Sequence, residues 1–348
     1  LLMTSMKVQL ESFLHKQWDR RGLISWLLLP FSAVFMGAAK YRKSKTVPVK
    51  IRVPVVVVGN IYVGGTGKTP VTIALVKELQ ERGWNPGVIS RGYKGKTDSP
   101  KEVLTTSDPD IVGDEPLLIK ESTNVPTFVS KKRVAAAEAL LKAYPEVDIL
   151  ISDDGLQHYE LQRDFEIAVI GARGLGNGWV LPSGPLREPP SRLNDVDALV
   201  LNATEDVISS TTPRYVATSG FTNAIQYATG EVISLDTLSK IQRKKQYSAA
   251  AVAGIAVPKR FFSMLRAHGL EVVGIPLPDH YDYDKNPFKD INADLIFITE
   301  KDAVKCRKHE DIKRDTRIYV VPLEIVLDKF LIDFIEEKLS SLKPEKKA

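Results

Sequence analysis

Cysteine is nearly absent from the chain, and long uncharged runs are few. Cys306 is the only cysteine among 348 residues, so no disulfide can form within the chain and a cysteine-based zinc site is excluded. Such usage is typical of a reducing cytosolic compartment. No dense run of basic side chains is interleaved with aromatics, so the pattern gives no indication of a nucleic-acid partner.

The composition is that of a folded chain with a mild excess of positive charge. Apolar residues make up 43% and charged residues 26%, and the net charge is +5 with a pI near 9.0. A chain of this length can form one large or two ordinary domains. The charge fits anionic partners such as a nucleotide, a phosphorylated substrate or acidic lipid headgroups.

Residues 23–39 form a stretch of 17 residues without a charge. A spanning helix needs roughly 20 apolar residues, so this one is short, and Pro30 predicts a kink. Basic residues flank the stretch and favour anionic headgroups: Arg20, Arg21, Lys40, Arg42 and Lys43. We predict a helix that lies on or dips into one membrane leaflet. A helix packed on the protein's own core and a signal peptide are the alternatives.

The remainder alternates between apolar runs and helical patterns. Val53–Val58 is a continuous β-branched run, which indicates a strand buried on both faces of a parallel sheet. A second α/β rhythm begins near Tyr247. We therefore predict a doubly wound, mostly parallel domain with a smaller α/β domain. The glycine-rich segment Tyr62–Thr69 after its first strand indicates that the larger domain is P-loop NTPase-like. The expected divisions are a membrane-associating segment 1–43, a P-loop domain 44–213, a β-stranded linker 214–246 and a C-terminal α/β domain 247–348.

A glycine-rich segment, Tyr62–Thr69 (YVGGTGKT), follows the Val53–Val58 run and matches the Walker A pattern except that Tyr62 replaces its first glycine. Glycines let backbone N–H groups converge on phosphate oxygens, and the next helix directs its positive end at them. Lys68 is expected at the β- and γ-phosphates, and the Thr69 hydroxyl at Mg²⁺. The other expected nucleotide-binding residues are Gly64, Gly65, Thr66 and Gly67.

A pair of acids, Asp153 and Asp154, follows the apolar run Ile149–Ser152. A carboxylate at the end of a buried strand beside the P-loop strand is the Walker B arrangement, so one of the two is expected to hold Mg²⁺. Two further clusters allow either chemistry or ordinary capping: Gly113–Pro116, and Thr299–Asp302, which could touch a nucleotide. The loop histidine His280 could be a site residue or an ordinary surface residue. The irregular stretch 174–190 is long for a loop inside a compact domain, which is typical of function.

Several stretches together resemble the tetraacyldisaccharide 4′-kinases of lipid A synthesis. They fall in order over roughly 245 residues: GNIYVGGTGKTP (59–70), SRGY (90–93), GDEP (113–116), DDGLQH (153–158), NGWVLPSGPLREP (177–189), GIAVPKRFF (254–262), PDHYDY (278–283) and TEKDA (299–303). The DDGLQH and GPLREP stretches are far more specific than the Walker A segment. The missing first glycine is also similar to the family's usual pattern.

The resemblance implies an activity and its partners. ATP, with Mg²⁺, would phosphorylate the 4′-hydroxyl of a membrane-embedded acylated glucosamine disaccharide 1-phosphate to give lipid IVA. The enzyme would work at the cytoplasmic face of the bacterial inner membrane, and its partners would be this lipid and the leaflet surface. No nucleic acid and no obligatory protein partner is expected.

The resemblance also implies roles for individual residues. Asp114 would be the catalytic base, paired with His280 from the second domain, and Lys68 and Asp154 complete the expected catalytic set. Thr69, Asp153 and Glu115 would serve the metal. Four residues would line the substrate site: Arg91, Tyr93, Arg187 and Glu188.

Two other functional classes compete with the lipid kinase. The first is a P-loop ATPase that acts as a switch or assembly factor. Many such ATPases carry lysine before the Gly-Gly of the loop, where this chain has Val63. The second is a membrane-attached scaffold that holds nucleotide without turnover, which the intact Lys68, Thr69 and acid pair disfavour.

Overall fold

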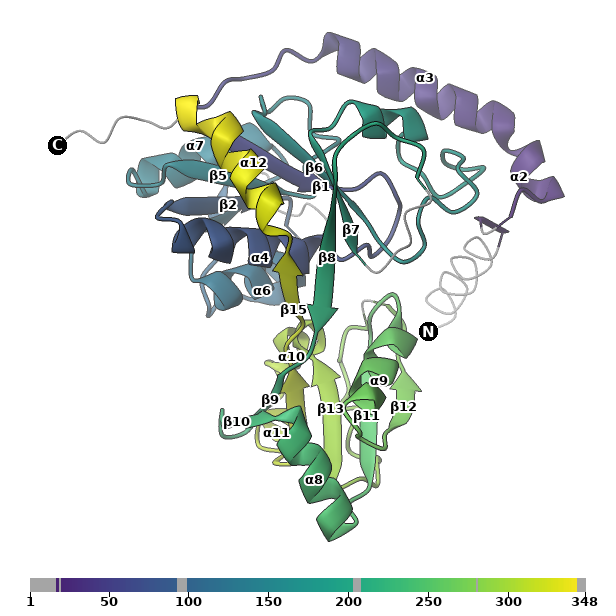
Figure 1. Cartoon of the computed structure of the whole chain (residues 1–348), viewed down its shortest axis with the longest axis vertical. Helices are drawn as coiled ribbons and strands as arrows, with labels where there is room; N and C mark the ends of the chain where they lie inside the picture. Colours follow the sequence, from purple (N-terminus) through teal and green to yellow (C-terminus); the bar gives the residue numbers. More distant parts are fainter. Residues whose placement is uncertain (1–16, 19, 93–98, 203–207, 280, 343–348) are drawn as a thin grey trace.

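The computed structural model describes residues 17–18, 20–92, 99–202, 208–279 and 281–342. Within them the chain forms two sheets, each covered by helices, and we call each sheet with its helices a body (Figure 1). The expected α/β fold with mostly parallel sheets is confirmed.

Nine strands make the sheet of the first body, in the spatial order β15-β8-β7-β6-β1-β5-β2-β4-β3. Seven neighbouring strands from β8 to β4 are parallel, and only the edge strands β15 and β3 are antiparallel. Their bounds are β1 Val55–Gly59, β2 Pro86–Ser90, β3 Lys101–Glu102, β4 Thr127–Val129, β5 Ile149–Asp153, β6 Phe165–Ile170, β7 Ala198–Asn202, β8 Arg214–Gly220 and β15 Glu324–Leu327.

Both faces of this sheet are buried, which explains the unbroken apolar runs. Val56 and Val58 face α4 (Lys68–Glu81) and α12 (Lys329–Leu339). Val55 and Val57 face α7 (Arg133–Ala143) and the loop after β6. A strand that is covered on both sides has no face exposed to solvent, so polar and apolar residues do not alternate along it. The first body is completed by α5 (Pro109–Val112), α6 (Asp114–Thr123) and the 3₁₀-helix η2 (Pro190–Asn194).

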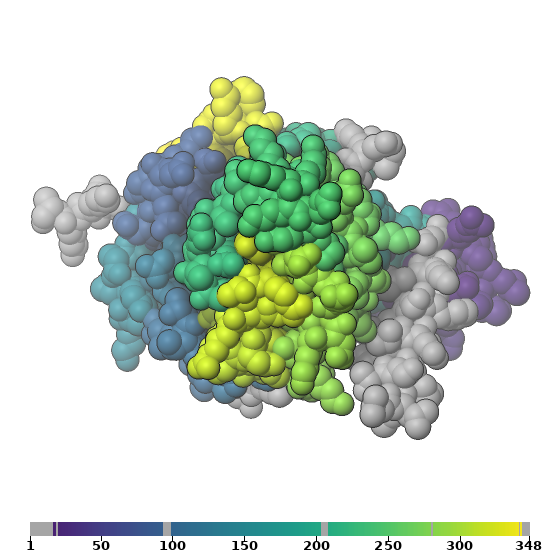
Figure 2. Space-filling view, turned by 90° about the horizontal axis from the view of Figure 1, so that it is seen from below, coloured from purple at the N-terminus to yellow at the C-terminus, as the bar shows by residue number. Residues whose placement is uncertain are grey.

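The second body has a six-stranded sheet in the order β10-β9-β14-β13-β11-β12. The strands are β9 Asn223–Gln226, β10 Val232–Ser234, β11 Ala249–Ala253, β12 Val273–Pro276, β13 Leu295–Thr299 and β14 Ile318–Val321. On one face lie α8 (Leu235–Lys245) and α9 (Pro258–Ala267), and on the other α10 (Glu300–Cys306) and α11 (Glu310–Lys313). Viewed along the long axis, this body lies in front of the first (Figure 2).

The chain crosses between the bodies twice, between β8 and β9 and again between β14 and β15. Residues 214–220 therefore belong to the first sheet, while residues 223–246 belong to the second body. After the second crossing, β15 pairs with β8, and the apolar face of α12 covers the first sheet. This differs from the expected linker 214–246 and domain 247–348. An amphipathic pattern indicates which face of a helix is apolar, and not which sheet the helix covers.

The apolar N-terminal stretch forms two helices, α2 (Leu23–Leu27) and α3 (Leu29–Lys45). The break lies at Leu28, and Pro30 occupies the first turn of α3, where its missing N–H costs no hydrogen bond. In Figure 1, α3 lies along the outside of the first body, away from the second. In the described part of the chain, no helix combines the length and apolar character that crossing a membrane requires.

Candidate active site

The phosphate loop, Tyr62–Thr69, joins the carboxyl end of β1 to the first turn of α4. Gly64 and Gly67 have φ angles of +117° and +84°, a region that favours glycine. Gly67 also lies so close to β7 that a Cβ atom there would be 2.0 Å from Asn202 Nδ2. Since α4 begins at Lys68, its free N–H groups point into the loop, which is the arrangement that binds phosphate.

Two buried asparagines hold this loop, and the sequence motifs did not identify them. Asn60 donates to Thr66 Oγ1 at 3.0 Å, and Asn202 donates to the Thr66 carbonyl oxygen at 3.1 Å. Asn60 comes directly after β1 and Asn202 ends β7. Polar residues at the carboxyl ends of neighbouring parallel strands were therefore the available signal.

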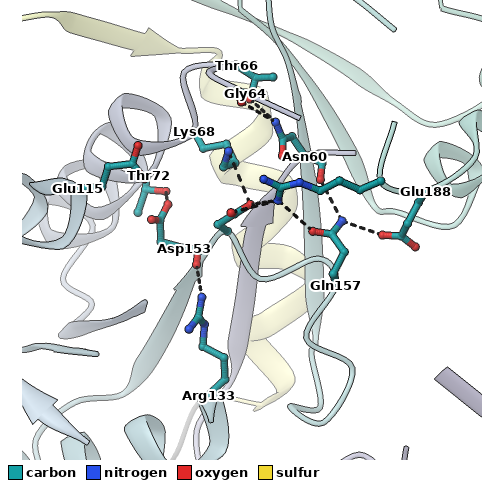
Figure 3. Close-up of polar contacts among 12 residues, drawn as sticks. Asn60, Gly64, Thr66, Lys68, Thr72, Glu115, Arg133, Asp153, Gln157 and Glu188 are labelled. Carbon is teal, nitrogen blue, oxygen red and sulfur yellow. Dashed lines mark hydrogen bonds and ion pairs between the residues drawn. The ribbon is translucent and has the colours of Figure 1, made fainter. Parts of the chain in front are cut away.

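The acid pair lies at the carboxyl end of β5, next to β1, and its two members differ in their surroundings (Figure 3). Asp153 is 1% exposed and accepts a hydrogen bond from Thr72 Oγ1 at 3.0 Å. Asp154 faces the phosphate loop instead, with Oδ1 3.6 Å from Lys68 Nζ and 3.1 Å from Arg187 Nη1.

The two carboxyl groups also have opposite pKa shifts. Burial raises the pKa of Asp153 to about 7, and the nearby charges of Glu115 and Asp154 add to the rise. Burial also acts on Asp154, but Lys68 and Arg187 outweigh it and hold the pKa of Asp154 below its ordinary value. At neutral pH only Asp154 is fully ionised, so one negative charge faces the loop.

A buried arginine supports the acid pair from behind. Arg133, at the start of α7, is 1% exposed and donates to the Asp153 carbonyl oxygen at 3.2 Å and to the Ser130 carbonyl oxygen at 3.1 Å. Burial lowers the pKa of Arg133 to about 10, which leaves it charged. Figure 3 shows it on the side of Asp153 away from Lys68.

Arg187 and Glu188, which were expected together at the substrate, have different surroundings. Arg187 reaches Asp154 and lines the site. Glu188 is held by Gln157, which donates to it at 2.8 Å, and by the Tyr159 hydroxyl, and Arg192 Nε lies 3.6 Å away. Glu188 therefore takes part in a polar network that fixes the loop carrying Arg187.

Helix α10 of the second body brings two lysines to the start of α6. Lys301 Nζ lies 2.9 Å from Glu115 Oε1, and Lys305 Nζ lies 3.4 Å from Asp114 Oδ2. The charge of Lys301 is the main cause that lowers the pKa of Glu115. The Thr299–Asp302 cluster caps α10, since the Thr299 hydroxyl accepts from Asp302 N at 3.2 Å, and it also places Lys301 at the cavity.

A cavity of about 510 Å³ lies between the bodies. The carboxyl ends of strands from both sheets meet there, since its lining includes the phosphate loop, residues 255–257 after β11, and Thr299–Lys301 after β13. The first body adds Glu115, Asp154 and Arg187. The second body adds an apolar wall that the motifs did not predict: Phe221, Ile255, Val257, Phe261, Met264 and Leu323.

Three predicted site residues remain: Arg91, Tyr93 and His280. Tyr93 and His280 lie outside the described residues. Arg91 is exposed just after β2, and its charge contributes to lowering the pKa of both Arg133 and His158. Burial is the main cause for His158 and lowers its pKa to about 4.

The oxygen donors that face the cavity fit a hard cation such as Mg²⁺. Thr69, Glu115 and Asp154 line the cavity, whereas Asp153 lies behind it. Magnesium in phosphotransferases typically takes one or two protein carboxylates and completes its shell with water and phosphate oxygens. Over the described ranges, no group of three or more histidine, cysteine, aspartate or glutamate side chains is arranged to hold a metal ion.

A glycine-rich loop between a central parallel strand and a helix, with an acid pair on the next strand, defines the P-loop nucleotide-binding class. Within that class, the chain belongs to the tetraacyldisaccharide-1-phosphate 4′-kinase family, whose model (LpxK: Tetraacyldisaccharide-1-P 4′-kinase) matches residues 24–340. The family resemblance seen in the motifs is thereby confirmed.

Individual relatives agree along nearly the whole chain. The tetraacyldisaccharide 4′-kinase of Herminiimonas arsenicoxydans is 48% identical, over 95% of this chain and 96% of its own. That of Janthinobacterium sp. is also 48% identical, over 97% and 98%. A crystal structure of LpxK from Aquifex aeolicus in complex with ATP is 25% identical, has a TM-score of 0.75, and aligns over 92% of this chain and 100% of its own.

Proposed function

We propose that the protein transfers the γ-phosphate of ATP to the 4′-hydroxyl of an acylated glucosamine disaccharide 1-phosphate, which gives lipid IVA. Family membership supports the reaction. The observation that carries the proposal is the cavity between the bodies, because it brings Lys68 and Thr69 of the phosphate loop into one space with Asp154, Glu115 and Lys301.

The cavity has the two surfaces that a nucleotide needs. The polar side contains the loop glycines and Lys68, which suit the phosphates. The apolar wall of the second body suits a base. The Aquifex aeolicus relative was solved with ATP, which supports ATP as the nucleotide here.

The chemistry assigned to the chain's own residues is a direct, in-line transfer. Asp114 accepts the proton of the 4′-hydroxyl, the sugar oxygen bonds to the γ-phosphorus, and the bond to the β–γ bridging oxygen breaks to release ADP. Lys68 stabilises the charge that develops on the transferred group, and Arg187 keeps Asp154 oriented and ionised. The pairing of Asp114 with His280 rests on the family resemblance.

Magnesium is proposed as the metal cofactor. Thr69, Asp154 and Glu115 would hold it, and Asp153 would act from behind, through Thr72 or a water molecule. When bound, Mg²⁺ supplies neutralisation of phosphate charge. The Lys301–Glu115 ion pair keeps that carboxylate ionised and directed at the cavity.

The N-terminal helices support attachment to a membrane leaflet, because their burial pattern is inverted. The buried residues of α2 and α3 are Ser25 and Ser32, and Ser32 donates to the Val180 carbonyl oxygen at 2.9 Å. The large apolar side chains point outward: Leu23, Trp26, Leu27, Phe31 and Val34. A helix packed on the protein's own core would show the reverse. The cytoplasmic leaflet of the bacterial inner membrane fits an acyl-chain substrate and this apolar, basic surface.

Loss of the exposed apolar surface of α2 and α3 should weaken membrane binding and leave the phosphate-transfer site intact. The double substitution Leu27→Ser and Phe31→Ser should weaken binding to vesicles of anionic phospholipid by about 10²- to 10⁴-fold, since each buried side chain contributes roughly 1.5–3 kcal/mol. Flotation measures this. Val273→Ser, at an exposed apolar site of the second body, is the matched control. Unchanged flotation of the double variant would contradict membrane attachment through α2 and α3.

The runner-up function is an ATPase switch or assembly factor. It shares the phosphate loop, so the two functions differ only in where the phosphate goes. With γ-labelled ATP and the lipid disaccharide 1-phosphate in detergent micelles, the kinase transfers label to the lipid and the Lys68→Met variant does not. Label released only as inorganic phosphate by folded wild-type protein would favour the switch.

A further inference from the structure

The contact between α6 and α10 joins the two bodies directly at the carboxylates of the site. Lys301 and Lys305 are four residues apart, so both lie on the same face of α10. That face meets the first turn of α6, where Lys301 pairs with Glu115 and Lys305 pairs with Asp114. Lys301 Nζ also lies 3.9 Å from Asp114 Oδ2, so Lys305 is the nearer of two cations beside that carboxylate. One turn of the second body thus supplies a cation to each acid at the start of α6.

The two lysines differ in what they face. Lys301 lines the cavity. Neither Lys305 nor Asp114 belongs to the cavity lining, and the side chain of each is only 11% exposed. Among the described residues no hydrogen-bond partner is found for Lys305 Nζ. Its ion pair with Asp114 Oδ2 at 3.4 Å, together with the nearby charge of Asp302, offsets the burial of its charge.

A third pair extends the same interface beyond the site. Arg307, next to the end of α10, forms an ion pair with Glu121 of α6 and donates to the Thr105 carbonyl oxygen at 2.8 Å. Asp114 and Glu121 are seven residues apart, so both face α10. The docking of α10 on α6 therefore has its own anchor, and Lys305 is not needed merely to hold the helices together.

We propose that Lys305 is a positioning residue that holds the Asp114 carboxylate in the direction of the acceptor hydroxyl, and that the second body thereby sets the geometry of a proton acceptor carried by the first. This role rests on the proposed kinase reaction, in which Asp114 is the base. Lys305 itself touches neither substrate. A carboxylate that swings away by about 1 Å can lose on the order of 10²-fold in rate without any change in nucleotide binding.

The test is a double-mutant cycle on the full-length protein with ATP and the lipid disaccharide 1-phosphate. Lys305→Met removes the charge at similar length, and should lower kcat by about 10- to 100-fold while KM for ATP stays within about twofold. Lys305→Arg restores a cation and should recover most of the loss. In an Asp114→Asn background, Lys305→Met should change kcat by less than about threefold, because the group it positions is gone.

Lys308→Met is the matched control. Lys308 lies three residues after Lys305 and pairs with Asp284, outside the contact between α6 and α10. Its removal should leave kcat unchanged. Melting curves confirm that every variant is folded at the assay temperature. Full activity of Lys305→Met, no recovery by Lys305→Arg, or an equally large loss in the Asp114→Asn background would each overturn the positioning role. Absence of lipid phosphorylation by the wild-type protein would instead overturn the proposed function.

Discussion

The two sides of the cavity are built in different ways. The first body contributes backbone: left-handed glycines, the N-terminus of α4, and short buried side chains such as Asn60 and Asn202 that fix the loop. The second body contributes side chains, an apolar wall and the long lysines of α10. The first side is held by hydrogen bonds within its own body, and the other depends on where the second body lies.

We expect substitutions in the phosphate loop to be tolerated less well than substitutions in the apolar wall. A Cβ atom on Gly65 would lie 3.0 Å from Ala256 Cβ of the second body, so the phosphate loop and the opposite wall almost touch. Binding of a nucleotide between them should therefore engage both sides together.

The largest expected effect is at Asp114, where the two sides meet. Asp114→Ala should lower kcat by about 10²–10⁴-fold, the usual scale for loss of a general base, with ATP affinity nearly intact. Steady-state kinetics with a separate nucleotide-binding titration measure both. Near-normal turnover would remove Asp114 from the role of base.

The rigid side is tested at Gly67. Gly67→Ala introduces a Cβ atom 2.0 Å from Asn202 Nδ2 at a φ of +84°, so the loop must move. ATP affinity should fall by about 10²-fold, since strain of roughly 1–3 kcal/mol adds to the clash. Calorimetric titration measures it. Gly83→Ala, at a φ of +82° but with open space around it, is the control for backbone strain alone. Equal losses in both variants would contradict the role of the close contact.

The adaptable side is tested at Ile255. Ile255→Ala trims the apolar wall, and should raise KM for ATP by about 10-fold with kcat little changed, because removal of methylenes from a pocket costs roughly 1–3 kcal/mol of binding. Val326→Ala, at an exposed strand position, is the control. An unchanged KM would show that the base does not bind against this wall.

A pH dependence of stability should originate at Asp153. Its pKa is about 7 in the folded state against 3.8 in the unfolded chain, so its stabilising contribution is present below pH 4 and is lost as the pH rises to 7. His158 acts in the opposite direction, because its lowered pKa costs stability as the pH falls from 6.5 to 4.

Comparison with Asp153→Asn cancels the contribution of His158. Without nucleotide or metal, a rise in pH from 4 to 7 should destabilise the wild type relative to the variant. The free energy of unfolding of the variant minus that of the wild type should increase by up to about 1.4 kcal/mol per pH unit. Urea unfolding at several pH values measures this gain. A constant difference between the two proteins would contradict the raised pKa of Asp153.

The contrast between the two sides of the cavity also explains which parts of the site could be predicted from the sequence. The phosphate loop and the acid pair were predictable because their chemistry is local: the residues that act are neighbours in the chain. Asp114 and Glu115 could be identified only through the family resemblance, since their partners Lys305 and Lys301 lie nearly 200 residues away. The apolar wall could not be predicted at all, because apolar residues that line a cavity are indistinguishable in sequence from those that fill a core.

The fold shows a similar limit. The continuous runs at Val55–Gly59 and Ile149–Asp153 predicted a sheet buried on both faces, and the structure confirms it. The return of β15 and α12 to the first body was not predictable, because it depends on β15 pairing with β8, which lies about 100 residues earlier in the chain.

One cavity, shared by the two bodies, should direct phosphate from ATP to a single sugar hydroxyl. Phosphorus–proton correlation NMR of the lipid product tests this most directly. We predict one new phosphomonoester signal that couples to the proton on carbon 4′ of the distal glucosamine. A new phosphate on any other hydroxyl, or on the existing 1-phosphate, would contradict it.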